Sequence, residues 1–101
     1  MKVSVVIPTY CRPQELNKCL EAILIQTSPP IEVIVIDNGP DEISKPLVQH
    51  KEKDFLGHGV SLRYIKNNRN SLTAARNLGA KSASGKIILF LDDDTIPSPD
   101  Y

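Results

Sequence analysis

The sequence predicts an α/β fold, a Rossmann-like, doubly wound, mostly parallel sheet of four strands with flanking helices. Short, continuously apolar runs alternate along the chain with segments whose apolar residues recur at helical spacing. Unbroken apolar runs are typical of strands buried on both faces of a parallel sheet. Regular alternation of strand and helix is typical of doubly wound α/β domains.

The first strand is predicted at residues 2–7 and is expected to stop at Pro8. Residues 9–11 then form a short turn, and Pro13 suits the first turn of a helix because its missing N–H has no partner there. One apolar stripe at helical spacing follows, formed by Leu16, Cys19, Leu20, Ile23 and Leu24.

A second buried strand is predicted at residues 31–36, running into a turn headed by Asp37. The pattern in residues 41–53 is weaker, and Pro46 within it favours only one or two short helical turns. Residues 55–60, which contain two glycines, are predicted to be a loop.

Residues 61–65 alternate between apolar and polar side chains, which predicts an exposed edge strand. A helix beginning near Leu72 carries a seam of small residues, and its Gly79 would allow close approach to the sheet. The last strand, residues 87–91, is continuously apolar and is therefore expected to be covered on both faces.

Length and composition limit the class of protein. Residues 1–101 have room for one small domain, and acidic and basic residues balance to a formal net charge of zero. The neutral charge and five scattered aromatic residues argue against a nucleic-acid partner. The longest apolar runs have five residues, so no membrane segment is predicted in this chain.

The two cysteines indicate a compartment. Cys11 and Cys19 are eight residues apart, about 12 Å along a helix, which is too far for a disulfide. Two free thiols and no signal peptide predict a cytoplasmic location, which is compatible with membrane association through a longer parent protein.

Three adjacent carboxylates, Asp92, Asp93 and Asp94, follow the last strand. They repel one another, and a bound hard cation is the simplest reason to keep them together. They stand at the carboxyl end of a strand, where open α/β sheets bind ligands. If the segment stays extended, Asp92 and Asp94 share one side and Asp93 points away.

Other polar groups are expected at the same edge of the sheet. Residues 8–10 (Pro8, Thr9 and Tyr10) follow the first strand, Asp37 follows the second, and Arg76 lies beside the apolar stripe of the helix after the third. Taken singly, Asp37 is equally compatible with a turn cap. Arg76 alone is more often a surface or salt-bridging residue, whereas the Asp triplet alone favours a site over a cap of the next element.

Four segments together carry a family resemblance. Residues 3–13 (VSVVIPTYCRP), 33–39 (VIVIDNG), 75–79 (ARNLG) and 90–95 (FLDDDT) resemble, in order and spacing, the successive motifs of family-2 glycosyltransferases. These are inverting enzymes with the GT-A fold. Cys11 stands where asparagine is common in the family, and Asn38 where a second aspartate is common.

The resemblance implies roles on the nucleotide side of the site. Pro8, Thr9 and Tyr10 match the segment lining the nucleotide pocket, and Arg76 matches an arginine beside the nucleotide. Asp37 matches the acid that hydrogen-bonds the base, typically uracil N3–H. The implied donor is a nucleoside-diphosphate sugar, UDP-sugar first of all.

The resemblance also implies a metal site. Asp92 and Asp94 match the two acids of the Asp-x-Asp motif, the first facing the ribose or the metal shell. The second coordinates Mg²⁺ or Mn²⁺ bridging the diphosphate. Asp93 occupies the variable middle position and is counted with the substrate-binding residues.

Family members are about twice this long or more, and their acceptor-binding half with the catalytic base follows the Asp-x-Asp motif. The chain is therefore expected to be the N-terminal nucleotide-sugar-binding portion of a hexosyltransferase, truncated after that motif. The catalytic base is expected beyond Tyr101, so that none lies within the chain itself. The chain should bind a donor but transfer little sugar to the unknown acceptor.

Two alternatives remain: a nucleotidyltransferase or sugar-nucleotide pyrophosphorylase, and a non-catalytic metal- or nucleotide-binding module. Truncation would also leave residues 87–91 with an unpaired strand edge, which predicts a homo-oligomer formed through that edge.

Overall fold

The computed structural model describes residues 2–68 and 71–97. Within these ranges the chain forms a four-stranded sheet of order β3-β2-β1-β4 in which every neighbouring pair is parallel. The elements are β1 (Val3–Thr9), α1 (Pro13–Leu24), β2 (Glu32–Asp37), α2 (Lys45–Gly57), β3 (Ser61–Lys66), α3 (Leu72–Ser82) and β4 (Ile87–Phe90). The predicted α/β class and parallel sheet are confirmed.

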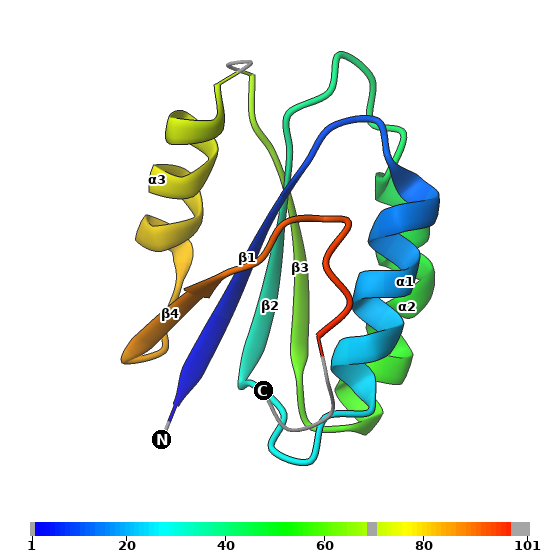
Figure 1. The fold of residues 1–101 in the computed structure, drawn as a ribbon, viewed down its shortest axis with the longest axis vertical. Helices are drawn as coiled ribbons and strands as arrows, with labels where there is room; N and C mark the ends of the chain where they lie inside the picture. The colour runs from blue at the N-terminus through cyan, green and yellow to red at the C-terminus, as the bar shows by residue number, and fades with distance from the viewer. Residues whose placement is uncertain (1, 69–70, 98–101) are drawn as a thin grey trace.

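The sheet is covered on both faces (Figure 1): α1 and α2 lie on one face and α3 on the other. The larger core fills the α1/α2 face, where the predicted stripe of α1 packs on the sheet through Leu16, Cys19, Leu20 and Ile23. The smaller core, under α3, consists of Val6, Ile34, Ile36 and Ala75.

Strand β1 runs through Pro8 to Thr9, so the prediction that it stops at Pro8 was wrong. The β1–β4 pairing ends at Val6 and Phe90, followed by one bond from the Leu91 N–H to the Val6 carbonyl. The backbone of Pro8 faces the same side as that of Val6, where β4 has already left the sheet. Among the described strands, none lies beside Pro8 on that side, so its missing N–H costs the sheet no hydrogen bond.

Helix α2 corrects the prediction for residues 41–60. It is a regular helix of 13 residues that includes Phe55, placed by the sequence in a loop. Pro46 lies in the first turn, where a missing N–H costs nothing, so it starts the helix and does not interrupt it. Val48 and Phe55 are fully buried and fix the helix to the sheet.

The two edges of the sheet differ from one another. Strand β3 lies at one edge, as predicted from its alternation. Strand β4 lies at the other, and the expectation that it is covered on both faces was wrong: Ile87 is 42% exposed and Phe90 is 40% exposed. The cause is that, among the residues the structure describes, β4 has a hydrogen-bonded neighbour only on its β1 side.

Two smaller expectations hold. A Cβ on Gly79 of α3 would lie 2.3 Å from Cγ1 of Val6, which confirms the close approach of that helix to the sheet. Cys11 and Cys19 are both free thiols. Within the described ranges, no helix has the length and apolarity needed to cross a bilayer.

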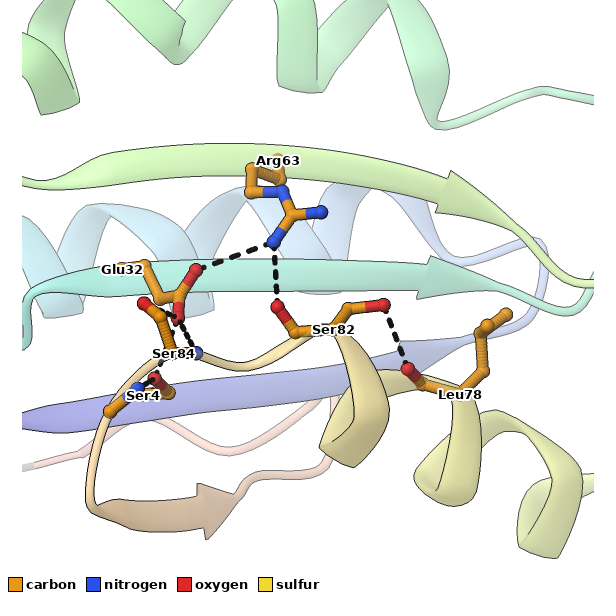
Figure 2. A network of polar contacts seen from close by, with 7 residues as sticks. Ser4, Glu32, Arg63, Leu78, Ser82 and Ser84 are labelled. Atoms are coloured by element: carbon orange, nitrogen blue, oxygen red, sulfur yellow. Dashed lines mark hydrogen bonds and ion pairs between the residues drawn. The ribbon is translucent and has the colours of Figure 1, made fainter.

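A buried carboxylate ties the amino-terminal half of the sheet together (Figure 2). Glu32 on β2 accepts hydrogen bonds from Ser4 of β1 at 2.8 Å and from the backbone and hydroxyl of Ser84 at 2.5 and 2.7 Å. Arg63 of β3 lies 3.5 Å from the same carboxylate and donates to the Ser82 carbonyl. The cluster joins the α3–β4 connection to three strands.

The charge of Glu32 is stabilised by these contacts. Burial alone would raise the pKa of Glu32, but the hydrogen bonds from Ser84 and Ser4, with the charge of Arg63, outweigh it and hold the pKa below its ordinary value of 4.5. Glu32 is therefore an ionised, fully bonded part of the fold.

Candidate functional site

The site follows from the strand order. The chain proceeds from β1 to β2 to β3 in one direction and then returns to place β4 on the other side of β1. In open α/β sheets, ligands bind at the carboxyl ends of the strands where this reversal occurs. Because β4 ends at Phe90 while β1 continues to Thr9, the backbone after β4 separates from β1 at this point.

A cavity of about 440 Å³ opens there. Its lining comes from the ends of β1, β2 and β4 and from the start of α1 and α3: Pro8, Thr9, Tyr10, Arg12, Asn38, Leu72, Asp92, Asp93 and Asp94. Six of the eight residues singled out in the sequence are therefore brought together. Asp37 and Arg76 are not part of this lining.

The position predicted for the catalytic base lies outside the described residues. That base is expected beyond Tyr101, and Tyr101 itself lies outside the described residues, which end at Pro97. The expectation that the base follows the Asp-x-Asp segment therefore stays a prediction.

The Asp triplet is bent, not extended. The Thr95 N–H donates to the Asp92 carbonyl at 3.0 Å, which closes a turn over residues 92–95. The prediction that strand alternation puts Asp92 and Asp94 on one side, with Asp93 pointing away, therefore does not apply. Asp92 and Asp94 are exposed, whereas Asp93 is buried.

Asp93 is anchored to the end of β1. The Thr9 hydroxyl donates to Asp93 Oδ2 at 2.9 Å, and the Tyr10 backbone N–H also bonds this carboxylate. Burial raises the pKa of the Asp93 carboxyl above its ordinary value, although the Thr9 bond and the Arg12 charge act in the opposite direction. Asp93 thus holds the acidic segment in place, and its neighbours Asp92 and Asp94 face the cavity.

Arg12 belongs to the same cluster and was missed in the sequence. Its Nη1 lies 3.5 Å from Asp93 Oδ1 and 3.6 Å from Asp94 Oδ2, while the side chain stays 53% exposed. The available signal was its position: it is a cation in the short segment that follows β1, at an edge where three acids gather.

Asp37 is fully buried at the end of β2. The Gly39 N–H donates to its Oδ1 at 2.9 Å, and the Tyr64 hydroxyl donates to its Oδ2 at 2.6 Å. The turn-cap alternative is therefore what Asp37 does in this structure. Tyr64 was missed, but register could have found it: Lys66 pairs with Asp37, which makes Tyr64 a diagonal neighbour on the same face.

A second cavity, of about 220 Å³, adjoins the turn that Asp37 caps. It is lined by Tyr10, Asn38, Gly39, Pro40, Lys66, Asn67 and Asn68. Tyr10 and Asn38 line both cavities, so the two spaces are neighbours. Lys66 donates to the Gly39 carbonyl and fixes the far side of the turn.

Arg76 is not brought to either cavity. It is exposed on α3, and its guanidinium carbon lies 5.9 Å from the centre of the Phe90 ring on β4. This distance is within the range of a cation–π contact. Arg76 is therefore a surface residue in this structure, in contact with an aromatic ring.

The donor set suits a hard divalent cation. In the described part of the chain, no three His, Cys, Asp or Glu side chains come together to hold a metal. Asp92 and Asp94 offer exposed carboxylate oxygens to one cavity. A cation held by two carboxylates needs further oxygens, and the phosphates of a bound substrate are the usual source.

The buried thiol nearby is not a candidate ligand. Cys19 Sγ lies 4.0 Å from the Asp92 carbonyl. Burial, with smaller effects from the charges of Asp93 and Asp94, raises the pKa of the Cys19 thiol to about 12. The Cys19 side chain is fully buried in the larger core, so it acts as a packing residue.

Comparison with known proteins decides the family. The model of the family described as glycosyl transferase family 2 matches residues 4–101. The chain belongs to this family. The family-2 chain is 39% identical over 95 residues to an uncharacterised glycosyltransferase of Rickettsia felis and 33% identical over 100 residues to the glycosyltransferase GlyA of Streptococcus pneumoniae.

These relatives are much longer. The matched regions cover 94% and 99% of this chain but only 15% and 14% of the two relatives. A crystal structure of S. aureus TarS residues 1-349 superimposes with a TM-score of 0.83 at 26% identity, over 98% of this chain and 29% of the solved TarS chain. The architecture is thus that of family-2 glycosyltransferases.

Proposed function

We propose that this chain is the nucleotide-sugar-binding portion of a glycosyltransferase. The observation that carries the proposal is the cavity of about 440 Å³ between β1 and β4. In a chain of glycosyl transferase family 2, this cavity unites residues 8–10 with Asp92 and Asp94. Family membership also favours a transferase over a nucleotidyltransferase or a non-catalytic module.

The proposed donor is a UDP-sugar. S. aureus TarS, 26% identical to this chain, has been solved in complex with UDP and with UDP-GlcNAc. The adjoining cavities, of about 440 and 220 Å³, offer separate room for the diphosphate beside the acids and for the base beside the β2 turn.

Asp92 and Asp94 are the proposed ligands of Mg²⁺ or Mn²⁺. Both are exposed to the cavity, and carboxylate oxygens are the donors that these cations prefer. When bound, the cation stabilises the negative charge that gathers on a departing nucleoside diphosphate. Asp93, bonded to Thr9, keeps the two acids at the end of β1.

Asp37 is proposed to act on the base through the turn it caps. Its carboxylate is buried and takes donors from Gly39 and Tyr64, so the residues it presents to the smaller cavity are Asn38 and Gly39. Arg76 remains a proposed nucleotide contact. It is one helical turn from Leu72, which lines the larger cavity, and would have to leave the Phe90 ring to reach it.

The transfer step is proposed to invert the anomeric carbon and to need a base for the acceptor hydroxyl. We assign that base to none of the described residues and expect it beyond Tyr101, in a longer parent protein. The 101 residues should therefore bind donor but show little transfer of a hexosyl group. Robust turnover of sugar nucleotides by this chain would contradict this part of the proposal.

Calorimetry with uridine nucleotides tests the binding function. UDP should bind much more tightly with Mn²⁺ than with EDTA, because the cation joins the carboxylates to the phosphates. UMP, which lacks the second phosphate, should gain less from Mn²⁺. Failure of UDP to bind under both conditions would refute donor binding, and equal binding with Mn²⁺ and EDTA would refute the metal site.

A further inference from the structure

A positively charged side chain, Arg12, lies beside the three adjacent acids Asp92, Asp93 and Asp94. The Arg12 guanidinium lies 3.5 Å from Asp93 and 3.6 Å from Asp94, on the wall of the larger cavity. Two of the three adjacent acids are therefore partly neutralised from within the chain. The Asp94 side chain is 58% exposed, so its carboxylate faces both this guanidinium and the open cavity.

The backbone directs Arg12 to this position. Cys11 adopts a φ of 51°, in the left-handed region that non-glycine residues rarely occupy. This residue reverses the chain between the end of β1 and the start of α1. Arg12 then caps α1, and its carbonyl accepts the Leu16 N–H at 2.9 Å. The base of the Arg12 side chain is thereby fixed, and only its exposed end is free to move.

We propose that Arg12 is a positioning residue that competes with the divalent cation for Asp94. The inference rests on the proposed function, since it concerns the same cation. While no cation is bound, the guanidinium screens the repulsion between Asp93 and Asp94. A cation at Asp94 displaces it, and the displaced guanidinium is then available to the diphosphate, an anion that arginine binds well.

Competition between Arg12 and the divalent cation should lower the affinity for the cation by a measurable factor. A unit charge about 5 Å from a divalent cation in a water-like dielectric changes the binding constant on the order of tenfold. The protein should therefore bind Mn²⁺ weakly without nucleotide. Binding of diphosphate and metal should be coupled, because each removes the obstacle to the other.

The variants Arg12→Gln and Arg12→Lys test the proposal, with Lys18→Gln on the exposed side of α1 as the matched charge control. Mn²⁺ is titrated into each protein without nucleotide, and free Mn²⁺ is followed by electron paramagnetic resonance. UDP is then titrated in EDTA by calorimetry. Circular dichroism melts establish that each variant is folded.

Arg12→Gln should bind Mn²⁺ alone about tenfold more tightly and UDP in EDTA more weakly. Arg12→Lys should stay near the wild-type protein in both titrations because it keeps the charge, and Lys18→Gln should match the wild type. Equal Mn²⁺ affinity in Arg12→Gln and wild-type protein would overturn the proposal, as would absence of Mn²⁺ binding in both.

Different measurements test the proposed function and the role of Arg12. Donor binding is refuted when wild-type protein does not bind UDP with Mn²⁺. The role of Arg12 is decided by the Mn²⁺ titration without nucleotide, whatever the UDP result.

Discussion

The Tyr64 hydroxyl donates to Asp37 Oδ2 at 2.6 Å, joining the edge strand β3 to the fully buried carboxylate at the end of β2. The second oxygen of Asp37 accepts the Gly39 N–H. Asp37 is thus held from one side by a neighbouring strand and from the other by its own turn. This arrangement fixes the residues that separate the two cavities.

Tyr64→Phe tests the importance of that bond. Removing the hydroxyl leaves a buried carboxylate oxygen without its donor, and hydrogen bonds to charged groups contribute about 1.5–3 kcal/mol. Urea denaturation should show a loss of this size in the free energy of unfolding. Tyr10→Phe, at a tyrosine that is 47% exposed, is the control and should change it by less than about 0.5 kcal/mol. Equal effects of the two substitutions would show that the Tyr64–Asp37 bond does not stabilise the fold.

Glu32 should make stability depend on pH in the acid range. Its pKa in the folded protein is held below the ordinary 4.5, chiefly by the bonds from Ser84 and Ser4 that overcome the effect of burial. A depressed pKa stabilises the fold above the unfolded value, and that stability is lost as pH falls from about 4.5 through the folded pKa. Urea midpoints measured between pH 7 and pH 3 should follow this course.

Glu32→Gln should remove most of that acid dependence. It should also lower the free energy of unfolding at pH 7 by about 2–3 kcal/mol, since the charged acceptor of several bonds is lost. Glu52→Gln, at an exposed position on α2, serves as the control. The explanation fails if Glu32→Gln retains the wild-type slope below pH 4.5.

Gly79→Ala should destabilise the protein even though alanine is the better helix former. The new Cβ would lie 2.3 Å from Cγ1 of Val6, so α3 or the Val6 side chain must shift. Such overpacking costs about 1–3 kcal/mol. Gly57→Ala is the matched substitution, since nothing lies within 4 Å of its added Cβ. Thermal melts should show a lower Tm for the first and an equal or higher Tm for the second, and the reverse order would contradict the packing of α3.

Cys11→Asn should stabilise the turn after β1. The φ of 51° strains most side chains, whereas asparagine tolerates the left-handed region. A gain of about 0.5–1 kcal/mol in the free energy of unfolding is expected, since the left-handed conformation costs an ordinary residue about 1–2 kcal/mol. Cys11→Val, with its branched side chain, should lower it. If both variants unfold at the same urea concentration, the strain is absent in solution.

The sequence was sufficient for most of the fold because each strand and helix has its own periodicity. It failed where the outcome depends on position within an element or on neighbours. In the sequence, Pro46 indicates a break in the helix, yet it lies in the first turn of α2 and starts the helix. The apolar run of β4 predicts a covered strand, but burial also requires a partner on each side. In the described part of the chain, β4 has a partner on its β1 side alone.

The candidate site was likewise predictable where it depends on the order of the strands, and unpredictable where it depends on neighbouring side chains. The carboxyl ends of parallel strands lie at the same edge of the sheet, so residues 8–10 and the Asp triplet could be placed together in advance. Which atoms bond to which depends on strand register and on one left-handed residue. Tyr64 reaches Asp37 through register, and Arg12 reaches Asp93 after the turn at Cys11. Neither contact is visible in the periodicity of the sequence.

The most direct measurement of the central claim is a calorimetric titration of UDP into wild-type protein and Asp94→Asn, each with Mn²⁺ and with EDTA. The carboxylate of Asp94 lines the cavity and is the proposed ligand of the cation, so its loss should abolish the gain in affinity that Mn²⁺ brings. Binding in EDTA should not weaken, because the substitution removes a negative charge beside the diphosphate and releases Arg12 from Asp94. An undiminished gain from Mn²⁺ in Asp94→Asn would contradict the claim that the Asp-x-Asp segment holds the metal and the donor's diphosphate.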